Sequence, residues 1–333
     1  MAIIRLPPKR GATLAKNKTQ SYDILPCVKS PRIALVALLV LVAACVAGCD
    51  KSAPGGGAGA DGRVQVVAAE NFWGSIAAQL GGERVSVRSI IVNPNTDPHS
   101  YEPSAEDART MAQAKLAIVN GIGYDNWAPR LLAASPVSGR VVLNVGDLLG
   151  LKAGDNPHQW YSPASVQRVI AQILADYDRL DPSGATYYAE RERTFESKDL
   201  ASYDRLRKEI RARYAGTPVG YSESIFRPLG EDLHLKLLTP YSFAKAVAEG
   251  TDVTAQDKEA VNRQARDRQI EVWVFNSQNV TPDVQRVNEL AKAAGIPIAT
   301  VTETLSPASD TFEQWQVGEL EGLLKALHEA TGR

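Results

Sequence analysis

Short runs of apolar, β-branched residues alternate along the chain with longer stretches whose apolar positions recur every three or four residues. The first pattern predicts strands and the second predicts amphipathic helices. The predicted strands are 64–69, 85–91, 116–120 and 141–145 in the first half, and 217–222, 235–240, 271–275 and 297–302 in the second. Because strands and helices alternate, we predict an α/β fold of two lobes, each with a four-stranded parallel sheet flanked by helices.

Four predicted helices cover 72–81, 104–114, 281–294 and 310–330. A further predicted helix begins at 162–163. Ser104, with Asp107 three residues later, has the spacing of a capping box at a helix start. Ser162 and Pro163 suit the N-cap and the first position of a helix, and Gly295 suits a helix end.

Residues 185–214 contain neither proline nor glycine and are rich in Glu, Arg, Lys and Tyr. At ~1.5 Å per residue, a single helix of this length would span about 45 Å, more than one small lobe needs. We predict a long, rigid backbone helix that joins the lobes; the alternative is two ordinary helices broken between 197 and 202. The predicted domains are an N-terminal lobe (63–183), a linking helix (184–215) and a C-terminal lobe (216–333).

The start of the chain has the pattern of an export signal, because scattered basic residues precede an apolar run over 33–47. This run is shorter than the ~20 residues that a spanning helix needs, although an uncleaved single-span anchor is the alternative. Val46-Ala47-Gly48-Cys49 resembles the bacterial lipobox, in which the cysteine is lipidated, and 42–45 is a weaker match. We predict a signal peptide (1–48), lipidation of Cys49 and a flexible glycine-rich tether (49–62).

Cleavage before Cys49 would remove Cys27 and Cys45, the other cysteines of the chain, so no disulfide is expected in the exported part. The chain has 37 basic and 38 acidic residues. Residues 1–48 hold seven of the basic residues and one of the acidic residues. The exported part therefore has 30 and 37, a formal charge of −7. A surface of this sign argues against nucleic acid as a partner.

Two of the four histidines stand in stiff, proline-containing loops. His99 lies within 93–104, where three prolines fix φ and keep the preceding residues out of the helical region, and His158 directly follows another proline. Such a loop can hold an imidazole in one place, and the repetition indicates a metal site. His234 and His328 have no matching partner, and we interpret them as structural.

Four candidate ligands follow predicted strand ends. His99 and His158 follow the second and fourth strands of the first lobe, and Glu223 and Glu303 follow the first and fourth strands of the second. Ligands of open α/β sheets bind beyond the carboxyl ends of the strands, so two imidazoles and two carboxylates would meet across the cleft between the lobes. Mixed nitrogen and oxygen donors suit Zn²⁺, Mn²⁺ or Fe²⁺ better than Mg²⁺ or Ca²⁺.

From about Val64 to its end, the chain resembles the zinc- and manganese-binding solute-binding proteins of ABC importers. The motifs that carry the resemblance are Asp-Pro-His-Ser-Tyr-Glu-Pro-Ser (97–104), Asn-Pro-His-Gln-Trp (156–160), Ser-Glu-Ser-Ile-Phe (222–226) and Glu-Thr-Leu (303–305). The resemblance implies a lipoprotein that captures one divalent metal ion outside the membrane and delivers it to a permease with a cytoplasmic ATPase. It also implies the metal ligands His99, His158, Glu223 and Glu303, and a linking helix that permits only small closing movements.

The resemblance leaves the metal open between Zn²⁺ and Mn²⁺. Zinc receptors of this family often carry a His-rich loop and a third histidine ligand, whereas this chain has no such loop and has Glu223 at that position. This pattern is closer to the manganese receptors, although their last ligand is usually aspartate and here it is Glu303. Affinity alone favours zinc at such a site.

Two other functions stay open at this point. A metallohydrolase is disfavoured, because catalytic zinc usually has three protein ligands and an open position, and no Gly-x-Ser-x-Gly or His-Glu-x-x-His motif is present. A receptor or adhesin for a chelated metal or another surface ligand would need aromatic or basic residues facing the cleft. Trp73, Trp127 and Trp160 are candidates, but packing between helices and sheet is the simpler role. We expect a monomeric, non-enzymatic receptor held at the membrane by its lipid.

Overall fold

The structure is a computed structural model that describes residues 62–96 and 98–333. The side chain of His99 is not among the described parts. The predicted signal peptide, Cys49 and the tether up to residue 61 also lie outside the described residues. Within the described ranges, no helix has both the length and the apolar character needed to cross a membrane.

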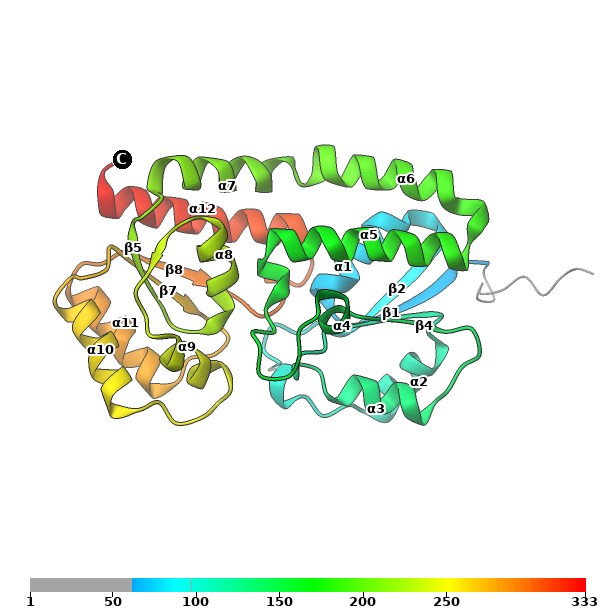
Figure 1. The fold of residues 1–333 in the computed structure, drawn as a ribbon, viewed down its shortest axis with the longest axis horizontal. Coiled ribbons are helices and arrows are strands. Elements are labelled where there is room, and N and C mark those ends of the chain that lie inside the picture. The colour runs from blue at the N-terminus through cyan, green and yellow to red at the C-terminus, as the bar shows by residue number, and fades with distance from the viewer. Residues whose placement is uncertain (1–61, 97) are drawn as a thin grey trace, which may run out of the picture. The chain divides into compact units, whose positions relative to one another are not determined.

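The N-terminal lobe is built on a four-stranded parallel sheet in the order β2-β1-β3-β4. Helices cover both of its faces (Figure 1). Alternate residues of β1 point to opposite faces: Val66 and Ala68 pack against α1 and α5, and Val67 and Ala69 lie in the cluster with α2 and α3. The strands are β1 (Val64–Glu70), β2 (Val85–Ile91), β3 (Leu116–Val119) and β4 (Val141–Asn144). The helices are α1 (Asn71–Gly81), α2 (Ala105–Gln113), α3 (Trp127–Ala134), α4 (Val145–Leu149) and α5 (Pro163–Leu180).

The C-terminal lobe repeats this plan with a four-stranded parallel sheet in the order β6-β5-β7-β8. Each sheet therefore places its first and third strands side by side at the centre. The strands are β5 (Pro218–Tyr221), β6 (Lys236–Leu237), β7 (Val272–Asn276) and β8 (Ile298–Val301). The helices are α8 (Arg227–Asp232), α9 (Tyr241–Ala248), α10 (Ala255–Arg266), α11 (Pro282–Ala293) and α12 (Phe312–Thr331). The predicted fold class is confirmed in both lobes.

The predicted linking segment is helical along almost all of its length. It consists of α6 (Ala185–Thr194), a π-helix (Phe195–Asp199) and α7 (Ala201–Tyr214). The Leu200 N–H donates to the Phe195 carbonyl at 2.8 Å, an i to i+5 bond that replaces the α-helical one. The π-helix overlaps residues 197–202, where the alternative hypothesis of two separate helices predicts a break. The predicted domain boundaries themselves stay a prediction.

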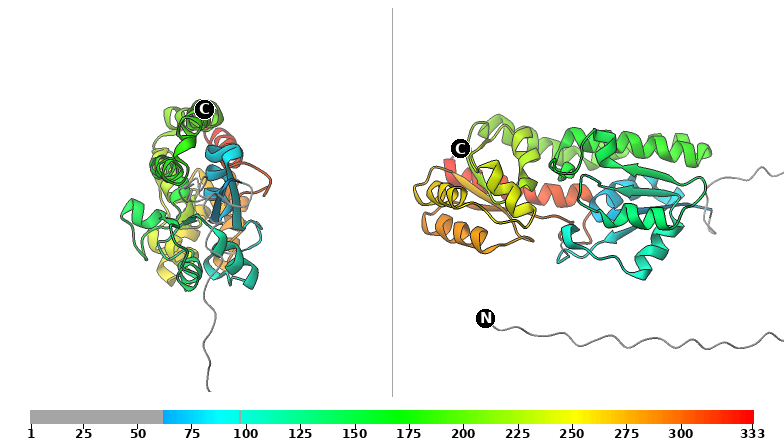
Figure 2. Two further views of the ribbon diagram at one scale, coloured as in Figure 1. Left: turned by 90° about the vertical axis from the view of Figure 1, so that its right-hand side faces the viewer. Right: turned by 60° about the horizontal axis from the view of Figure 1, so that its bottom comes forward.

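A second helix also connects the lobes. α12 packs beside α7, as Figures 1 and 2 show, and its first turn reaches α1 of the N-terminal lobe. There the Phe312 N–H donates to Ser75 Oγ at 2.9 Å, and Gln79 Nε2 donates to Glu313 at 2.8 Å. One hydrophobic cluster accordingly runs through both lobes.

Candidate metal centre

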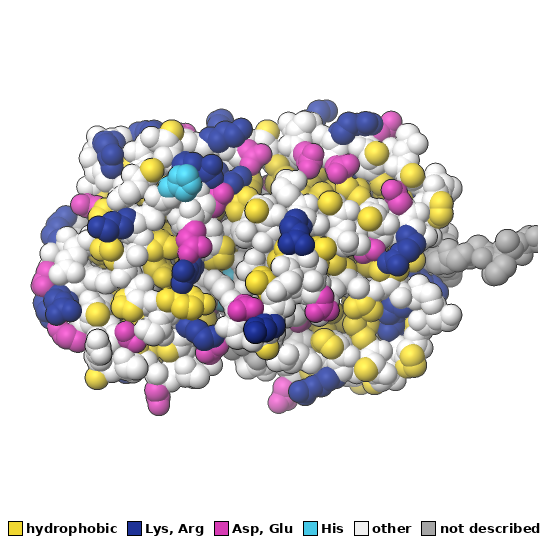
Figure 3. Space-filling model, in the orientation of Figure 1, with side chains coloured by type: hydrophobic (Ala, Val, Ile, Leu, Met, Phe, Trp, Pro, Cys, Tyr) yellow, Lys and Arg dark blue, Asp and Glu magenta, His cyan; other side chains and the backbone are white. Residues whose placement is uncertain are grey.

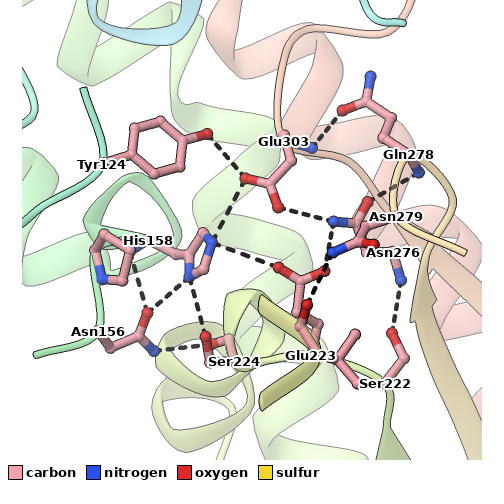
Figure 4. A network of polar contacts seen from close by, with 12 residues as sticks. Tyr124, Asn156, His158, Ser222, Glu223, Ser224, Asn276, Gln278, Asn279 and Glu303 are labelled. Carbon is pink, nitrogen blue, oxygen red and sulfur yellow. Dashed lines mark hydrogen bonds and ion pairs between the residues drawn. The ribbon is translucent and has the colours of Figure 1, made fainter. Parts of the chain in front are cut away.

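Three of the four predicted ligands lie together between the lobes (Figure 4). His158 comes from the loop that leads into α5, Glu223 follows β5 by two residues, and Glu303 follows β8 by two residues. Their side chains are almost completely buried, with residue exposures of 0%, 0% and 3%. One ligand atom from each residue lies within 4.8 Å of the other two.

The spacing of these atoms fits a bound cation. His158 Nε2 lies 3.7 Å from Glu223 Oε1 and 3.5 Å from Glu303 Oε2. These separations are longer than ordinary hydrogen bonds. An ion held tetrahedrally at about 2.1 Å from each donor would set the donors about 3.4 Å apart. The two separations from His158 Nε2 therefore match those between donors in a small tetrahedral coordination shell.

Neighbouring polar groups set the orientation of the imidazole. Asn156 Nδ2 donates to the Ser224 carbonyl at 2.8 Å, which fixes the amide so that its oxygen lies 2.7 Å from His158 Nδ1. The Nδ1–H therefore donates to Asn156, and Nε2, which faces the two carboxylates, carries the lone pair that a metal needs.

The side chains of Asn276 and Tyr124 orient the two carboxylates, and neither residue is among the predicted site residues. Asn276, at the end of β7, donates from Nδ2 to Glu223 Oε2 and to Glu303 Oε1, each at 2.8 Å. Tyr124, from the opposite lobe, donates from its hydroxyl to Glu303 Oε2 at 2.9 Å. The Glu303 N–H donates to Gln278 Oε1 at 2.6 Å, which fixes the backbone. Asn276 ends β7, which lies between the strands that precede Glu223 and Glu303. This position at a strand end is the sequence signal that could have identified it.

Burial opposes charge throughout this cluster. It raises the pKa of Glu223 well above its usual value, and the nearby charge of Glu303 raises it further. It lowers the pKa of His158 to about 4. Both groups therefore favour their neutral forms when no cation is present, whereas a divalent cation stabilises the ionised carboxylate and the neutral imidazole together.

Among the described side chains, those of His234, His328 and the candidate tryptophans do not belong to this cluster. The backbone of His99 lies in a short 3₁₀ turn (Pro98–Ser100) after β2, and its role as a ligand stays a prediction. His234 precedes β6, and His328 contacts the C-terminal carbonyl of Arg333 from α12. Trp73, Trp127 and Trp160 are buried in the hydrophobic clusters of the N-terminal lobe, at exposures of 0%, 7% and 0%.

Comparison with known proteins gives the family. The profile of the family described as "Zinc-uptake complex component A periplasmic" (ZnuA) matches residues 66–326. The chain belongs to this family.

Among relatives of this ZnuA-family chain, the manganese-binding lipoprotein MntA of Halalkalibacterium halodurans is 30% identical over 154 residues, which cover 45% of this chain and 51% of that protein. The zinc-binding lipoprotein AdcA of Streptococcus pneumoniae is 23% identical over 309 residues, which cover 82% of this chain and 56% of AdcA. This chain spans only about half the length of these relatives.

Solved structures show the same fold. The Mn-bound periplasmic metal-binding protein of Candidatus Liberibacter asiaticus superimposes with a TM-score of 0.66 at 22% identity, over 79% of this chain and 99% of that chain. The binding protein FpvC of Pseudomonas aeruginosa, in complex with Mn²⁺, gives a TM-score of 0.64 at 20% identity, over 80% of this chain and 99% of that chain.

Proposed function

We propose that this chain is an extracytoplasmic solute-binding lipoprotein that captures one Zn²⁺ or Mn²⁺ ion between its lobes and delivers it to the permease of an ABC importer. The observation that carries the proposal is the buried cluster of His158, Glu223 and Glu303, which draws donors from both lobes to within 4.8 Å. The family membership supports transport, and the names of MntA and AdcA support the choice of metals.

In this proposal the ligands are His158 Nε2, one oxygen each of Glu223 and Glu303, and His99. With both carboxylates ionised and both imidazoles neutral, these ligands would carry a charge of −2, which a bound divalent cation neutralises. One nitrogen and two oxygen donors are already assembled in the structure, a set that suits transition metals better than Mg²⁺ or Ca²⁺.

The proposed partners are the permease, its cytoplasmic ATPase and, through lipidation of Cys49, the membrane. The relatives named lipoproteins support the anchor. On the face shown in Figure 3, basic and acidic side chains are interspersed, an arrangement that offers nucleic acid no continuous basic surface. We propose a monomer that acts by binding and release.

A non-enzymatic role fits the burial of the site. Four protein ligands would fill a tetrahedral shell and leave no position for a reactive water, unlike the three-ligand sites of zinc hydrolases. The three described residues are at most 3% exposed, so a substrate has no access to them in this conformation.

The test is calorimetric titration of the purified, metal-stripped protein with Zn²⁺ and with Mn²⁺. We expect one tight site per chain, lost in His158→Ala and in Glu223→Ala while the metal-free circular dichroism spectrum is unchanged. The exposed His328, which does not belong to the cluster, provides the matched control variant His328→Ala. Absence of binding by the unchanged protein would refute the proposed function, and unchanged binding by His158→Ala would refute the ligand assignment.

A further inference from the structure

A carboxylate outside the candidate metal centre contacts two of the loops that carry the proposed ligands. Glu319, on α12, accepts a hydrogen bond at Oε1 from the Thr302 N–H at 2.9 Å, and the Thr302 hydroxyl lies at the same distance from that oxygen. Trp315 Nε1, one helical turn earlier, also donates to Oε1 at 2.9 Å. Thr302 is the residue before Glu303, so these bonds fix the backbone from which that ligand projects.

The second oxygen of the same carboxylate faces the other lobe. The Tyr161 hydroxyl lies 2.5 Å from Glu319 Oε2 and 2.9 Å from the Thr302 carbonyl. Tyr161 follows His158 by three residues, in the 3₁₀ turn (Gln159–Tyr161) that joins the histidine loop to α5. Glu319 therefore connects the Glu303 loop of one lobe with the His158 loop of the other.

The contacts of Thr302 extend to the far side of Glu303. Its hydroxyl also lies 2.9 Å from the Thr304 carbonyl, so the residues on both sides of the ligand belong to one network. Because His158 Nε2 and Glu303 Oε2 are only 3.5 Å apart, a small shift of either loop would change the separation of the donors. A metal site is sensitive to such shifts, since the groups that orient its ligands contribute strongly to affinity.

Removing the Glu319 carboxylate from water disfavours its charged form, and an uncharged side chain could pack at this position without that penalty. Burial raises the pKa of Glu319 to about 8, even though Tyr161, Thr302 and Trp315 all donate toward it. A half-buried carboxylate that disfavours its own charge lies here where three elements meet: α12, the exit of β8 and the turn before α5.

We propose that Glu319 is a positioning residue that sets the spacing between Glu303 and His158 and so maintains metal affinity. This inference rests on the proposed function. Glutamine at the same position would keep the network, because its oxygen accepts from Thr302 and Trp315 while its amide donates to the Tyr161 oxygen. Tyr161 would then direct its own proton to the Thr302 carbonyl.

The test compares Glu319→Ala, Glu319→Gln and the control Glu321→Ala, an exposed residue of the same helix. Affinity and dissociation rate are measured for Zn²⁺ and Mn²⁺ on the full chain. We expect Glu319→Ala to weaken binding about 10- to 100-fold, mainly through faster dissociation. Glu319→Gln should bind like the unchanged protein, as should Glu321→Ala.

Tyr161→Phe tests the same network if Glu319→Ala does not fold, because it removes only one hydroxyl. We expect faster metal dissociation in this variant. Where Glu319→Ala folds, adding it to Tyr161→Phe should change the dissociation rate little further. Tight binding by Glu319→Ala and Tyr161→Phe would overturn the inference and leave the proposed function standing, as would a Glu319→Gln variant as weak as Glu319→Ala. Failure of the unchanged protein to bind either metal would overturn both.

Discussion

At the scale of single residues, the centre keeps its polar groups in a fixed arrangement while removing them from water. Asn276 donates to both glutamates, and Asn156 sets which imidazole nitrogen carries the proton. Neither residue carries a charge, so both orient the ligands without competing for a cation. Such prior arrangement favours ion binding, because fewer side chains lose conformational freedom when the ion binds.

We predict that Asn276→Ala weakens metal binding about 10- to 100-fold, because both carboxylates lose the donor that orients them. Calorimetric titration of the metal-stripped variant measures this. Asn279→Ala is the matched control: Asn279 lies in the same loop but donates to the Val247 carbonyl at 3.2 Å instead of to a glutamate. Equal affinities for the two variants would contradict the prediction.

A second prediction concerns Glu70, the last residue of β1. It is completely buried, and both of its carboxylate oxygens lack hydrogen-bond partners among the described residues. Burial raises the pKa of Glu70 well above its usual value of 4.5, and the charge of Asp125 adds to the effect. The folded state therefore holds a proton that the unfolded state loses, so this residue makes the protein less stable as the pH rises above 4.5.

Glu70→Gln should remove that penalty. The free energy of unfolding of the variant, relative to that of the unchanged protein, should rise by about 1.4 kcal/mol per pH unit until the folded-state pKa is reached. Urea unfolding of the metal-free proteins at pH 5 and pH 8 measures the difference. Glu83→Gln, at an exposed position, serves as the control. A difference that does not change with pH would contradict this account.

At the scale of elements, short polar signals fix where helices begin. Ser104 and Asp107 form the capping box that their spacing predicts, with the Asp107 N–H donating to Ser104 Oγ at 3.2 Å and Asp107 Oδ2 accepting from the Ser104 N–H at 2.7 Å. The box begins α2 immediately after the loop that contains His99. It therefore fixes the backbone at the point where α2 begins.

We expect Ser104→Ala to lower the free energy of unfolding by about 1 kcal/mol, the usual value of an N-cap side chain. Urea unfolding measures this loss. Glu106→Ala, an exposed change in the same helical turn, should have a much smaller effect because its ion pair with Arg88 is long, at 3.7 Å, and exposed. A loss as large in the control would show that the cap is not the cause.

Elements with a strong apolar pattern, and the long segment without proline or glycine, were predictable from the sequence, whereas short or weakly patterned elements were not. α5 carries Val166, Val169, Ile170 and Ile173 on its buried face, and its predicted start at Ser162 is confirmed. α10 buries only Val261, Gln264 and Ala265, too narrow a stripe to stand out. β6 has only two residues, because the chain turns toward α9 at Pro240.

The same distinction applies to the candidate centre. Glu223 and Glu303 could be found because they follow strand ends, where parallel sheets gather their ligands. His158 lies beyond α4, and the stiff loop after Pro157 was its sequence signal. Tyr124 could not be found, since its contact with Glu303 joins residues 179 positions apart in the chain. Glu319 was missed for a related reason: the amphipathic pattern of α12 places it on a helix but does not show which loop packs against it.

At the scale of the whole molecule, the described side chains of the candidate metal centre come from both lobes, so an ion bound there should stabilise the association of the lobes. We predict that Zn²⁺ or Mn²⁺ at 100 times its dissociation constant raises the free energy of unfolding by about 2.7 kcal/mol, because the ion binds only the folded state. Thermal unfolding with and without metal measures this. Glu303→Ala should lose the shift, and an equal shift in that variant would place the bound ion elsewhere.

The paired connection of α7 and α12 limits how the lobes can separate. One connecting segment between two lobes allows rotation about several axes. Two helices packed side by side bend easily in the direction perpendicular to the plane that contains them, and they resist rotation within that plane. The lobes should therefore part by tilting in one preferred direction. In the proposed function, the ion would then enter and leave at one opening edge, and the opposite edge of the cleft would stay closed.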